Sequence, residues 1–332
     1  MILLGTADVG PAKYIVELYR LDELDNGLFE YVGGELTTPL FSKNALKLND
    51  NWKESSPKLI VSGTSLGDSL DKKLIIWAKK NNIPSISLIE HWSWYRKRFE
   101  LNGELILPDY IFVNDQIACD DAITDGLPAE KLVIAGNPVL EELRNRSNKE
   151  LNRDKLLVQY NLPTHKRVIV FISEELASEF NNTDSDLGYD EFTVLKKIIE
   201  HLEPSDYLVI KSHPVESLDK YNSFVNNQIK TIQNMDIHEL NCIADYVVGM
   251  ASMLLLELAM LRNDVISFRP NATKSFIGNR LKATVDITSE KKFTQTVLQR
   301  EELTADGSFR NHFQGSTARI VSLIKELAQL KS

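Results

Sequence analysis

The sequence predicts an α/β protein built from two Rossmann-like domains, with parallel sheets that face each other across a cleft. Three observations lead to this prediction. Short apolar segments alternate with amphipathic helical segments, a pattern typical of parallel sheets covered by helices. The length of 332 residues exceeds what one ordinary hydrophobic core organises. A charged segment at 139–165, without a strand-like run, separates two halves of similar length.

The first half begins with a strand at 1–5, and Pro11 then opens a helix over 11–24 because proline suits the first helical turn. A second helix is expected over 68–82, where the apolar residues share one face. Further strands are expected where short apolar runs end in polar residues or glycine, at 58–63, 85–89, 110–114 and 132–136.

The same alternation resumes after the charged segment. Strands are expected at 167–173, 206–212, 244–249 and 263–268, and helices at 192–202 and 316–330. The expected domain limits are therefore 1–145 and 146–332, and the last helix is placed so that it can pack back on the N-terminal domain.

Composition excludes several classes of protein. The chain is 43% hydrophobic and 26% charged, as in ordinary globular proteins, and its formal net charge is −9. An acidic chain is a poor candidate for wrapping nucleic acid, because such binding depends on neutralising phosphates. Cys119 and Cys242 lack the spacing of a zinc site or a disulfide framework, which fits a reducing compartment.

The hydrophobic segments do not predict export or membrane insertion. The first ten residues have no basic region and no long apolar core, so we expect no signal peptide. The longest apolar-rich stretch, at 246–261, contains Glu257 and is too short to span a bilayer. A cytoplasmic location is therefore expected.

Ligands of open parallel sheets bind beyond the carboxyl ends of the strands, so the loops after the strands are the candidate sites. The loop at 4–13 contains Gly5 and Gly10 and runs into a helix N-terminus, which suits an anion, although a tight turn explains it equally well. The loop at 61–71 offers hydroxyl groups, including Thr64, to a sugar. Neither loop has a dinucleotide or ATPase phosphate-binding pattern.

The segment IEHWSWYRKRFE at 89–100 gathers acidic, basic and aromatic side chains after a strand. Tryptophan rings stack well on the apolar faces of sugars, and Trp92 and Trp94 are candidates for such contacts, together with Arg98. Glu90 or His91 can act as a general base if a substrate hydroxyl comes within hydrogen-bond reach. The alternative is a helix that covers the edge of the sheet, with solvated arginines.

In the second half, the strand at 206–212 runs into IKSHPVES. Lys211 and His213 can donate hydrogen bonds to phosphate oxygens and offset the charge of a departing nucleotide, although a histidine before a proline also fits a turn. Ser173 and Glu174 follow the strand at 167–173, in a long polar loop of the kind that often contacts ligands or is simply solvated.

A small-residue turn at Gly249, Ala251 and Ser252 precedes an apolar helix. Ser252 is placed either as the helix N-cap or as a phosphate ligand. Glu257 lies on that helix and needs a polar partner, for which ribose hydroxyls, a neighbouring backbone group or an arginine are the alternatives.

Together these motifs resemble the GT-B type of nucleotide-sugar glycosyltransferase and its relative, the non-hydrolysing UDP-N-acetylglucosamine 2-epimerase. The resemblance rests on three stretches, at 126–143 with its Gly-Asn-Pro string, at 210–214 and at 244–270. The acidic-acidic-glycine motif of sialyltransferases is absent from the first half, where TDG at 124–126 is the nearest string, and the epimerase signatures are absent too.

Lys211, His213 and Pro214 resemble the His-Pro motif of bacterial capsule and lipopolysaccharide transferases, including users of CMP-sialic acid, CMP-Kdo and CDP-glycerol. The resemblance implies that His213 and Ser252 contact the phosphates of the donor and that Glu257 contacts its ribose.

The function implied is a metal-independent glycosyltransferase of surface polysaccharide or glycoconjugate synthesis, without a cofactor, that uses a CMP-, CDP- or UDP-linked sugar as co-substrate. The C-terminal domain would bind this donor. The N-terminal domain would bind a saccharide or lipid-linked saccharide acceptor near Gly5, Gly10 and 90–94. An Asp-x-Asp metal motif is absent from the candidate loops.

Two alternatives stay open at this point, a nucleotide-sugar epimerase or hydrolase and a non-catalytic nucleotide-sugar-binding protein. A nucleic-acid partner is not expected. Peripheral contact with the inner membrane face through 92–99, where aromatic and basic residues mix, and assembly as a homodimer are left open.

Overall fold

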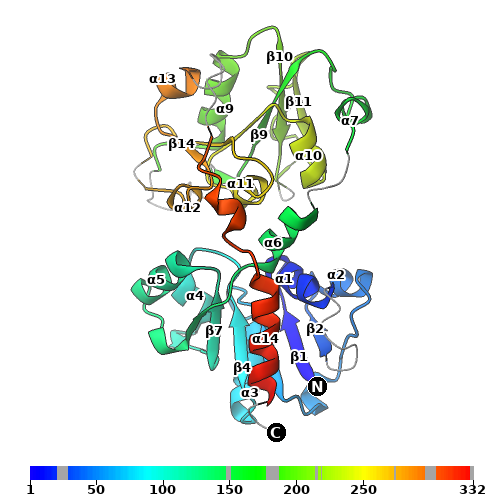
Figure 1. Ribbon diagram of the computed structural model, residues 1–332, viewed down its shortest axis with the longest axis vertical. Coiled ribbons are helices and arrows are strands. Elements are labelled where there is room, and N and C mark those ends of the chain that lie inside the picture. The colour runs from blue at the N-terminus through cyan, green and yellow to red at the C-terminus, as the bar shows by residue number, and fades with distance from the viewer. Residues whose placement is uncertain are drawn as a thin grey trace. The chain divides into compact units, whose positions relative to one another are not determined.

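The computed structural model describes residues 1–20, 29–146, 151–176, 187–213, 216–217, 219–272, 274–295 and 304–329. The chain forms two compact units, Met1–Glu142 together with Phe313–Ser332, and Leu143–His312. Each unit contains a six-stranded sheet in which neighbouring strands run parallel (Figure 1). The predicted α/β class with two Rossmann-like parallel sheets is confirmed.

The sheet of the first unit has the order β2-β1-β3-β4-β7-β8. Its strands are β1 (Ile2–Thr6), β2 (Phe29–Gly33), β3 (Leu59–Ser62), β4 (Ser85–Leu88), β7 (Tyr110–Val113) and β8 (Leu132–Ile134). A small antiparallel pair consists of β5 (Glu100–Leu101) and β6 (Glu104–Leu105). The helices are α1 (Val9–Arg20), α2 (Thr38–Lys43), α3 (Leu70–Lys80), α4 (Tyr95–Phe99), α5 (Gln116–Thr124) and α14 (Ser316–Gln329), with 3-10 turns η1 (Trp52–Glu54) and η2 (Ala129–Lys131).

The sheet of the second unit has the order β11-β10-β9-β12-β13-β14. Its strands are β9 (Arg167–Ile172), β10 (Asp206–Lys211), β11 (Ile229–Ile232), β12 (Tyr246–Gly249), β13 (Val265–Phe268) and β14 (Val285–Ile287). The helices are α7 (Arg153–Gln159), α9 (Glu191–Glu200), α10 (Ile237–Ile243), α11 (Met253–Ala259), α12 (Ile277–Arg280) and α13 (Glu290–Phe293), with the 3-10 turn η5 (Ser308–Asn311). Helix α6 (Pro138–Asn145) contains the boundary between the two units.

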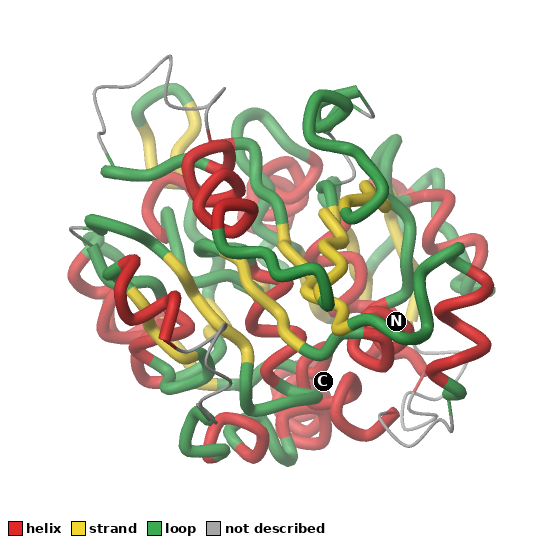
Figure 2. Tube along the Cα trace, turned by 90° about the horizontal axis from the view of Figure 1, so that it is seen from above, coloured by secondary structure: helices red, strands yellow, loops and turns green. Residues whose placement is uncertain are grey.

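The position of each strand in its sheet explains which strands the sequence pattern revealed. Every strand expected from the sequence is present, and the central ones, such as β1, β9 and β10, are apolar because helices cover both faces of the sheet (Figure 2). Within the two six-stranded sheets, the strands that were not expected, β2, β11 and β14, all lie at sheet edges, although the edge strand β8 was expected. The short pair β5 and β6 was not expected either. The sequences of β2, β11 and β14, FEYVG, IKTI and VDI, include polar residues that are partly buried or exposed, which masks the strand signal.

The last helix belongs to the first unit. Ile320, Val321 and Ile324 of α14 are buried in the same hydrophobic core as Leu4 of β1 and Ile15 of α1. In Figure 1, α14 accordingly lies beside β1 and α1. The contact brings the end of the chain to the sheet formed by its beginning.

Candidate functional site

The strand register of the second unit brings three loops together. Lys211, the last residue of β10, pairs with Ile172 at the end of β9, and Ile172 also pairs with Gly249 at the end of β12. Parallel strands end at one edge of the sheet, so the loops that begin with Ser212, Ser173 and Met250 start side by side. Among the sequence-predicted residues, this arrangement brings Lys211, His213, Ser173, Glu174 and Ser252 to one edge.

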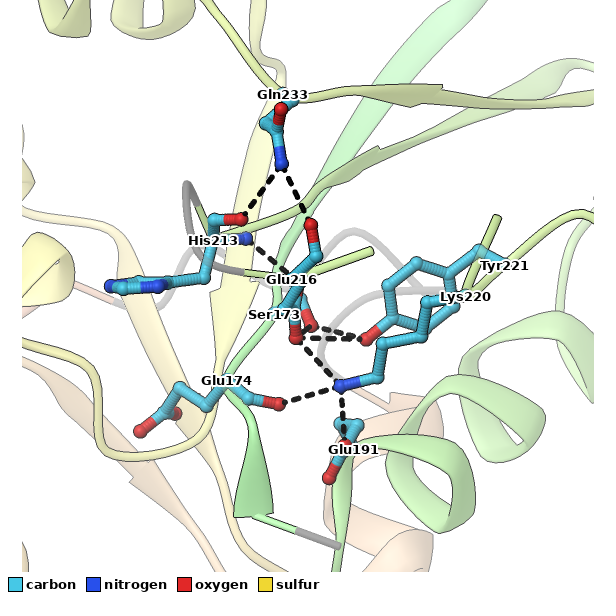
Figure 3. A network of polar contacts seen from close by, with 8 residues as sticks. All are labelled: Ser173, Glu174, Glu191, His213, Glu216, Lys220, Tyr221 and Gln233. Carbon is cyan, nitrogen blue, oxygen red and sulfur yellow. Dashed lines mark hydrogen bonds and ion pairs between the residues drawn. The ribbon is translucent and has the colours of Figure 1, made fainter. Parts of the chain in front are cut away.

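A buried polar network joins the first two of these loops (Figure 3). Glu216 lies at its centre, and its side chain is fully buried. Its Oε1 accepts hydrogen bonds from the Ser173 hydroxyl and from the Lys220 ammonium, each at 2.7 Å. Its Oε2 accepts from the backbone N–H of His213 at 2.7 Å. The network therefore connects the end of β9 with the loop after β10.

The two candidate phosphate-binding residues after β10 lie in different surroundings. The Lys211 side chain is buried and donates to the carbonyl of Ser212 at 3.0 Å. Burial lowers the pKa of Lys211, although the nearby Glu216 carboxylate raises it. The His213 side chain is exposed at the surface of the loop. Pro214 lies outside the described residues.

At the third loop, the carboxylate of Glu174 occupies the turn that precedes α11. Its Oε1 accepts from the backbone N–H of Ala251 at 2.7 Å. Ser252 is the N-cap of α11, where its hydroxyl oxygen accepts from the N–H of Leu254 at 3.2 Å. Glu257 lies partly buried on α11. The role of Ser252 and Glu257 as nucleotide contacts stays a prediction.

Glu174→Gln is expected to remove a pH dependence of stability. Burial raises the pKa of Glu174 from 4.5 to about 7, against the lowering effect of the backbone N–H groups around Ala251. Between these values the folded state binds the proton more tightly than the unfolded state, so the free energy of unfolding falls as pH rises. From pH 4.5 to pH 7, the wild type should lose about 3 kcal/mol relative to the variant.

Urea denaturation of both proteins at several pH values measures this difference. Glu175→Gln is the matched control, because it removes a carboxylate at the adjacent position. Parallel curves for Glu174→Gln and the wild type would show that Glu174 takes up no proton on folding.

In the first unit, Glu90 follows β4 and lies against the first turn of α1. A Cβ atom on Gly10 would be 3.0 Å from Oε1 of Glu90, so a larger residue at this position would require the carboxylate to shift by a few tenths of an ångström. Oε2 of Glu90 is buried and has no hydrogen-bond partner within the described part of the chain. Burial raises the pKa of Glu90, Arg98 at 3.8 Å lowers it, and Asp8 and Asp71 raise it. The carboxyl group is therefore able to take up a proton.

Arg98 connects the loops around Glu90. Its guanidinium is buried and donates to the carbonyls of Ser93 at 3.0 Å and Thr64 at 3.2 Å. His91 shares a hydrogen bond with the Ser93 hydroxyl at 2.9 Å. Burial and the charge of Arg98 lower the pKa of His91 to about 4, so its imidazole is neutral at neutral pH. Thus Glu90, Arg98, Thr64 and Gly10 share one edge of the sheet.

Two residues at this edge were missed by the sequence reasoning. Asp71 and Lys72 begin α3, where a helical pattern assigns them to the solvated face, yet both are buried. Asp71 accepts from the N–H of Ala7 at 3.1 Å, while its Oδ1 has no partner among the described residues. Lys72 donates to the carbonyl of Ser65 at 2.8 Å, and burial lowers its pKa. Only their burial in the folded chain distinguishes them from surface residues.

Three of the predicted substrate contacts lie in other surroundings. Gly5 is buried in β1, where a Cβ would be 2.7 Å from Cδ1 of Leu74. Trp92 is buried, and its indole N–H donates to Asp115 at 2.8 Å. Trp94 is 57% exposed with the Lys97 ammonium 4.9 Å from its ring centroid. The structure therefore gives Gly5 and Trp92 packing roles and leaves Trp94 accessible to a ligand.

The described residues also limit two other kinds of site. In this part of the chain, no helix is long and apolar enough to cross a membrane. Across the same residues, we find no group of three or more histidine, cysteine, aspartate or glutamate side chains that could hold a metal ion. Cys119 and Cys242 are both free thiols.

No protein-family model and no curated protein matches this chain. Solved structures match it over nearly its whole length. The UDP-GlcNAc 2-epimerase of Neisseria meningitidis bound to UDP-GlcNAc has a TM-score of 0.68 at 12% identity, covering 98% of this chain and 99% of that one. Anabaena Alr3699/HepE in complex with UDP-glucose has a TM-score of 0.65 at 13% identity, covering 100% and 99%. The chain has the GT-B fold.

A third structure with the GT-B fold, the glycotransferase of kitacinnamycin, has a TM-score of 0.64 at 13% identity and covers 98% of both chains. The expected resemblance is thereby confirmed at the level of the fold. An epimerase and a glycotransferase are both among these structures, so the GT-B fold alone does not distinguish the two reactions.

Proposed function

We propose that this protein is a glycosyltransferase that moves a sugar from a nucleotide-activated donor to an acceptor hydroxyl. The observation that carries the proposal is the Glu90 carboxylate, which lies against Gly10 with a buried Oε2 that lacks a partner among the described residues. Burying such an oxygen without a hydrogen bond costs free energy, and a substrate hydroxyl would supply the missing donor.

In the reaction, Glu90 accepts the proton of the acceptor hydroxyl. The acceptor oxygen forms a bond to the anomeric carbon of the donor sugar, and the bond from that carbon to the phosphate oxygen breaks. The nucleotide leaves as an anion, which His213 and the groups around Ser252 stabilise by hydrogen bonds. Arg98 keeps Glu90 from holding its proton too strongly, since its charge lowers the pKa of Glu90.

The second unit supplies the nucleotide side of the proposal. Nucleotide sugars are bound in the epimerase and HepE structures that share the fold, which supports a nucleotide-sugar site here. The exposed His213, the capping residue Ser252 and Glu257 would contact phosphate and ribose. Buried Lys211, at the end of β10, would add positive charge near the phosphates. The acceptor and the product would belong to surface polysaccharide or glycoconjugate synthesis, with a CMP-, CDP- or UDP-linked donor.

A second candidate is a nucleotide-sugar 2-epimerase or hydrolase. Asp71 and Glu90 favour it because each is a carboxylate with one buried oxygen that lacks a partner in the described chain. Two such groups can serve two proton transfers on one bound sugar. This reaction consumes the donor without any acceptor.

The first test is a thermal-shift screen with CMP, CDP, UDP, GDP and ADP. A nucleotide at one hundred times its Kd stabilises the folded state by about 2.7 kcal/mol, so a clear rise in Tm is expected for one nucleotide. His213→Ala should lose this rise. His201→Ala is the control. His201 lies at the end of α9, just before β10, and therefore at the amino ends of the strands, whereas His213 lies at their carboxyl ends. A cooperative melt that no nucleotide shifts would contradict the proposed site.

Mass spectrometry of the donor then separates the reactions. The transferase should release nucleotide only with an acceptor present, and Glu90→Gln should lose turnover while it keeps the thermal shift. Free nucleotide or an altered sugar from the donor alone would favour the epimerase or hydrolase. If the protein binds nucleotide but shows no turnover with any acceptor, it is a non-catalytic nucleotide-sugar-binding protein.

A further inference from the structure

The backbone of His213 is held at both of its polar groups by side chains, those of buried Glu216 and of partly exposed Gln233. Its N–H donates to Glu216, and its carbonyl accepts from Nε2 of Gln233 at 3.2 Å. The same Gln233 nitrogen donates to the carbonyl of Glu216 at 3.0 Å. In Figure 3 the imidazole of His213 points away from this network. The network therefore holds the peptide groups from which the exposed ring projects.

Glu216 is itself held firmly. Its carboxylate accepts from four donors, the Ser173 hydroxyl, the Lys220 ammonium, the His213 amide and, at 3.5 Å, the Tyr221 hydroxyl. Ser173 follows directly after β9, a central strand of the sheet. The Glu216 carboxylate is hydrogen-bonded both to Ser173 at the end of this strand and to the His213 amide. These bonds fix the position of the His213 amide relative to the sheet.

Glu216 also provides a negative charge close to two lysines. Lys220 lies between Glu191 at 2.6 Å and Glu216 at 2.7 Å, and both carboxylates are buried. Lys211 is buried in the same region, and the charge of Glu216 favours its protonated form. Removing Glu216 would thus affect both predicted phosphate-binding residues, whereas removing Glu191 would affect Lys220 alone among these cations.

We propose that Glu216 is a positioning residue that sets the direction of the His213 imidazole through the His213 amide. The inference rests on the proposed function, in which that imidazole meets a phosphate of the nucleotide. A carboxylate that accepts an amide hydrogen bond holds it more strongly than a neutral acceptor. The peptide groups of His213 are therefore held in place before the nucleotide arrives, which lowers the entropic cost of binding.

The test compares Glu216→Gln with Glu191→Gln, a matched control in which the same lysine loses an equally buried carboxylate. The first readout needs no nucleotide. It is hydrogen exchange of the His213 amide, followed by NMR in protein labelled with ¹⁵N-histidine and assigned by His213→Ala. Exchange should become at least about tenfold faster in Glu216→Gln, because glutamine has one acceptor oxygen where Glu216 has two, and the Lys220 ammonium competes for it. In Glu191→Gln, exchange should stay close to wild type.

The second readout is the affinity for UDP, measured by calorimetry. Glu216→Gln should weaken binding at least about tenfold, and Glu191→Gln should change it little. In the His213→Ala background, Glu216→Gln should weaken binding much less than in the wild-type background, because only its effect through Lys211 remains. A merely structural role would give the same loss in both backgrounds.

Glu216→Asp is the second variant if Glu216→Gln does not fold. It keeps the negative charge for Lys220 but is one methylene shorter, so it cannot reach both the Ser173 hydroxyl and the His213 amide. Unchanged exchange of the His213 amide in these variants, or equal changes in the Glu191 control, would overturn the inference. If wild-type protein does not bind UDP or the other nucleotides, the proposed function fails, while the exchange measurement still decides the role of Glu216.

Discussion

Lys220→Met is expected to destabilise the second unit by about 3–5 kcal/mol, because it leaves the buried carboxylates of Glu191 and Glu216 without their shared cation. Burial alone would lower the pKa of Lys220, yet its hydrogen bonds to these two carboxylates raise the pKa above the ordinary value. The pair of contacts thus outweighs the cost of burying the ammonium. Methionine keeps most of the volume of the lysine side chain, so the loss of stability reports the removal of the positive charge.

Lys197→Met is the matched control. Lys197 also contacts two carboxylates, Glu200 at 3.0 Å and Glu290 at 3.2 Å, but all three side chains are substantially exposed. Water screens such pairs, so this variant should unfold at nearly the wild-type urea concentration. Equal losses from Lys197→Met and Lys220→Met would show that burial does not strengthen the Lys220 contacts.

The position of the tryptophans makes the measurement selective. All four tryptophans, Trp52, Trp77, Trp92 and Trp94, belong to the first unit. Far-UV circular dichroism reports both units, whereas tryptophan fluorescence reports the first. In Lys220→Met the circular dichroism should begin to fall at lower urea, and the fluorescence transition should move less.

Gly136→Ala is expected to destabilise the first unit by about 2–5 kcal/mol. Gly136 has φ = +102°, a backbone conformation that residues other than glycine rarely adopt. An added Cβ would also lie 2.6 Å from Cβ of Ser316. Ser316 begins α14 and is fully buried, so the helix or the strand end must move. The carbonyl of Gly136 also accepts from the Tyr14 hydroxyl at 2.6 Å, and this contact would be disturbed as well.

Gly67→Ala separates the two causes. Gly67 also has a positive φ, +69°, but an added Cβ would meet no atom within 4 Å. It should therefore cost only the backbone strain, about 1–2 kcal/mol. Urea denaturation followed by tryptophan fluorescence should show a clearly larger loss for Gly136→Ala. Equal losses would mean that α14 adjusts without cost.

The alternation of strands and helices could be predicted because it depends on local composition. Strands β1, β9 and β10 are covered on both faces, so their central residues are apolar and stand out from the chain, with polar residues only at the strand ends. The edge strands β2, β11 and β14 have partly exposed positions with polar residues, and the same reasoning missed them. Loops after central strands were thus identified, and with them Lys211, His213 and Glu90.

The partners of those residues follow from the tertiary structure alone. Glu216, Asp71 and Lys72 have sequences around them that fit a solvated surface, and a charged side chain is recognised as buried only when its partner is known. Ser173, Lys220 and Glu191 come from separate elements, and folding places them around Glu216. Local patterns specify which elements form, because they depend on neighbours in sequence, whereas the pairing of buried charges depends on neighbours in space.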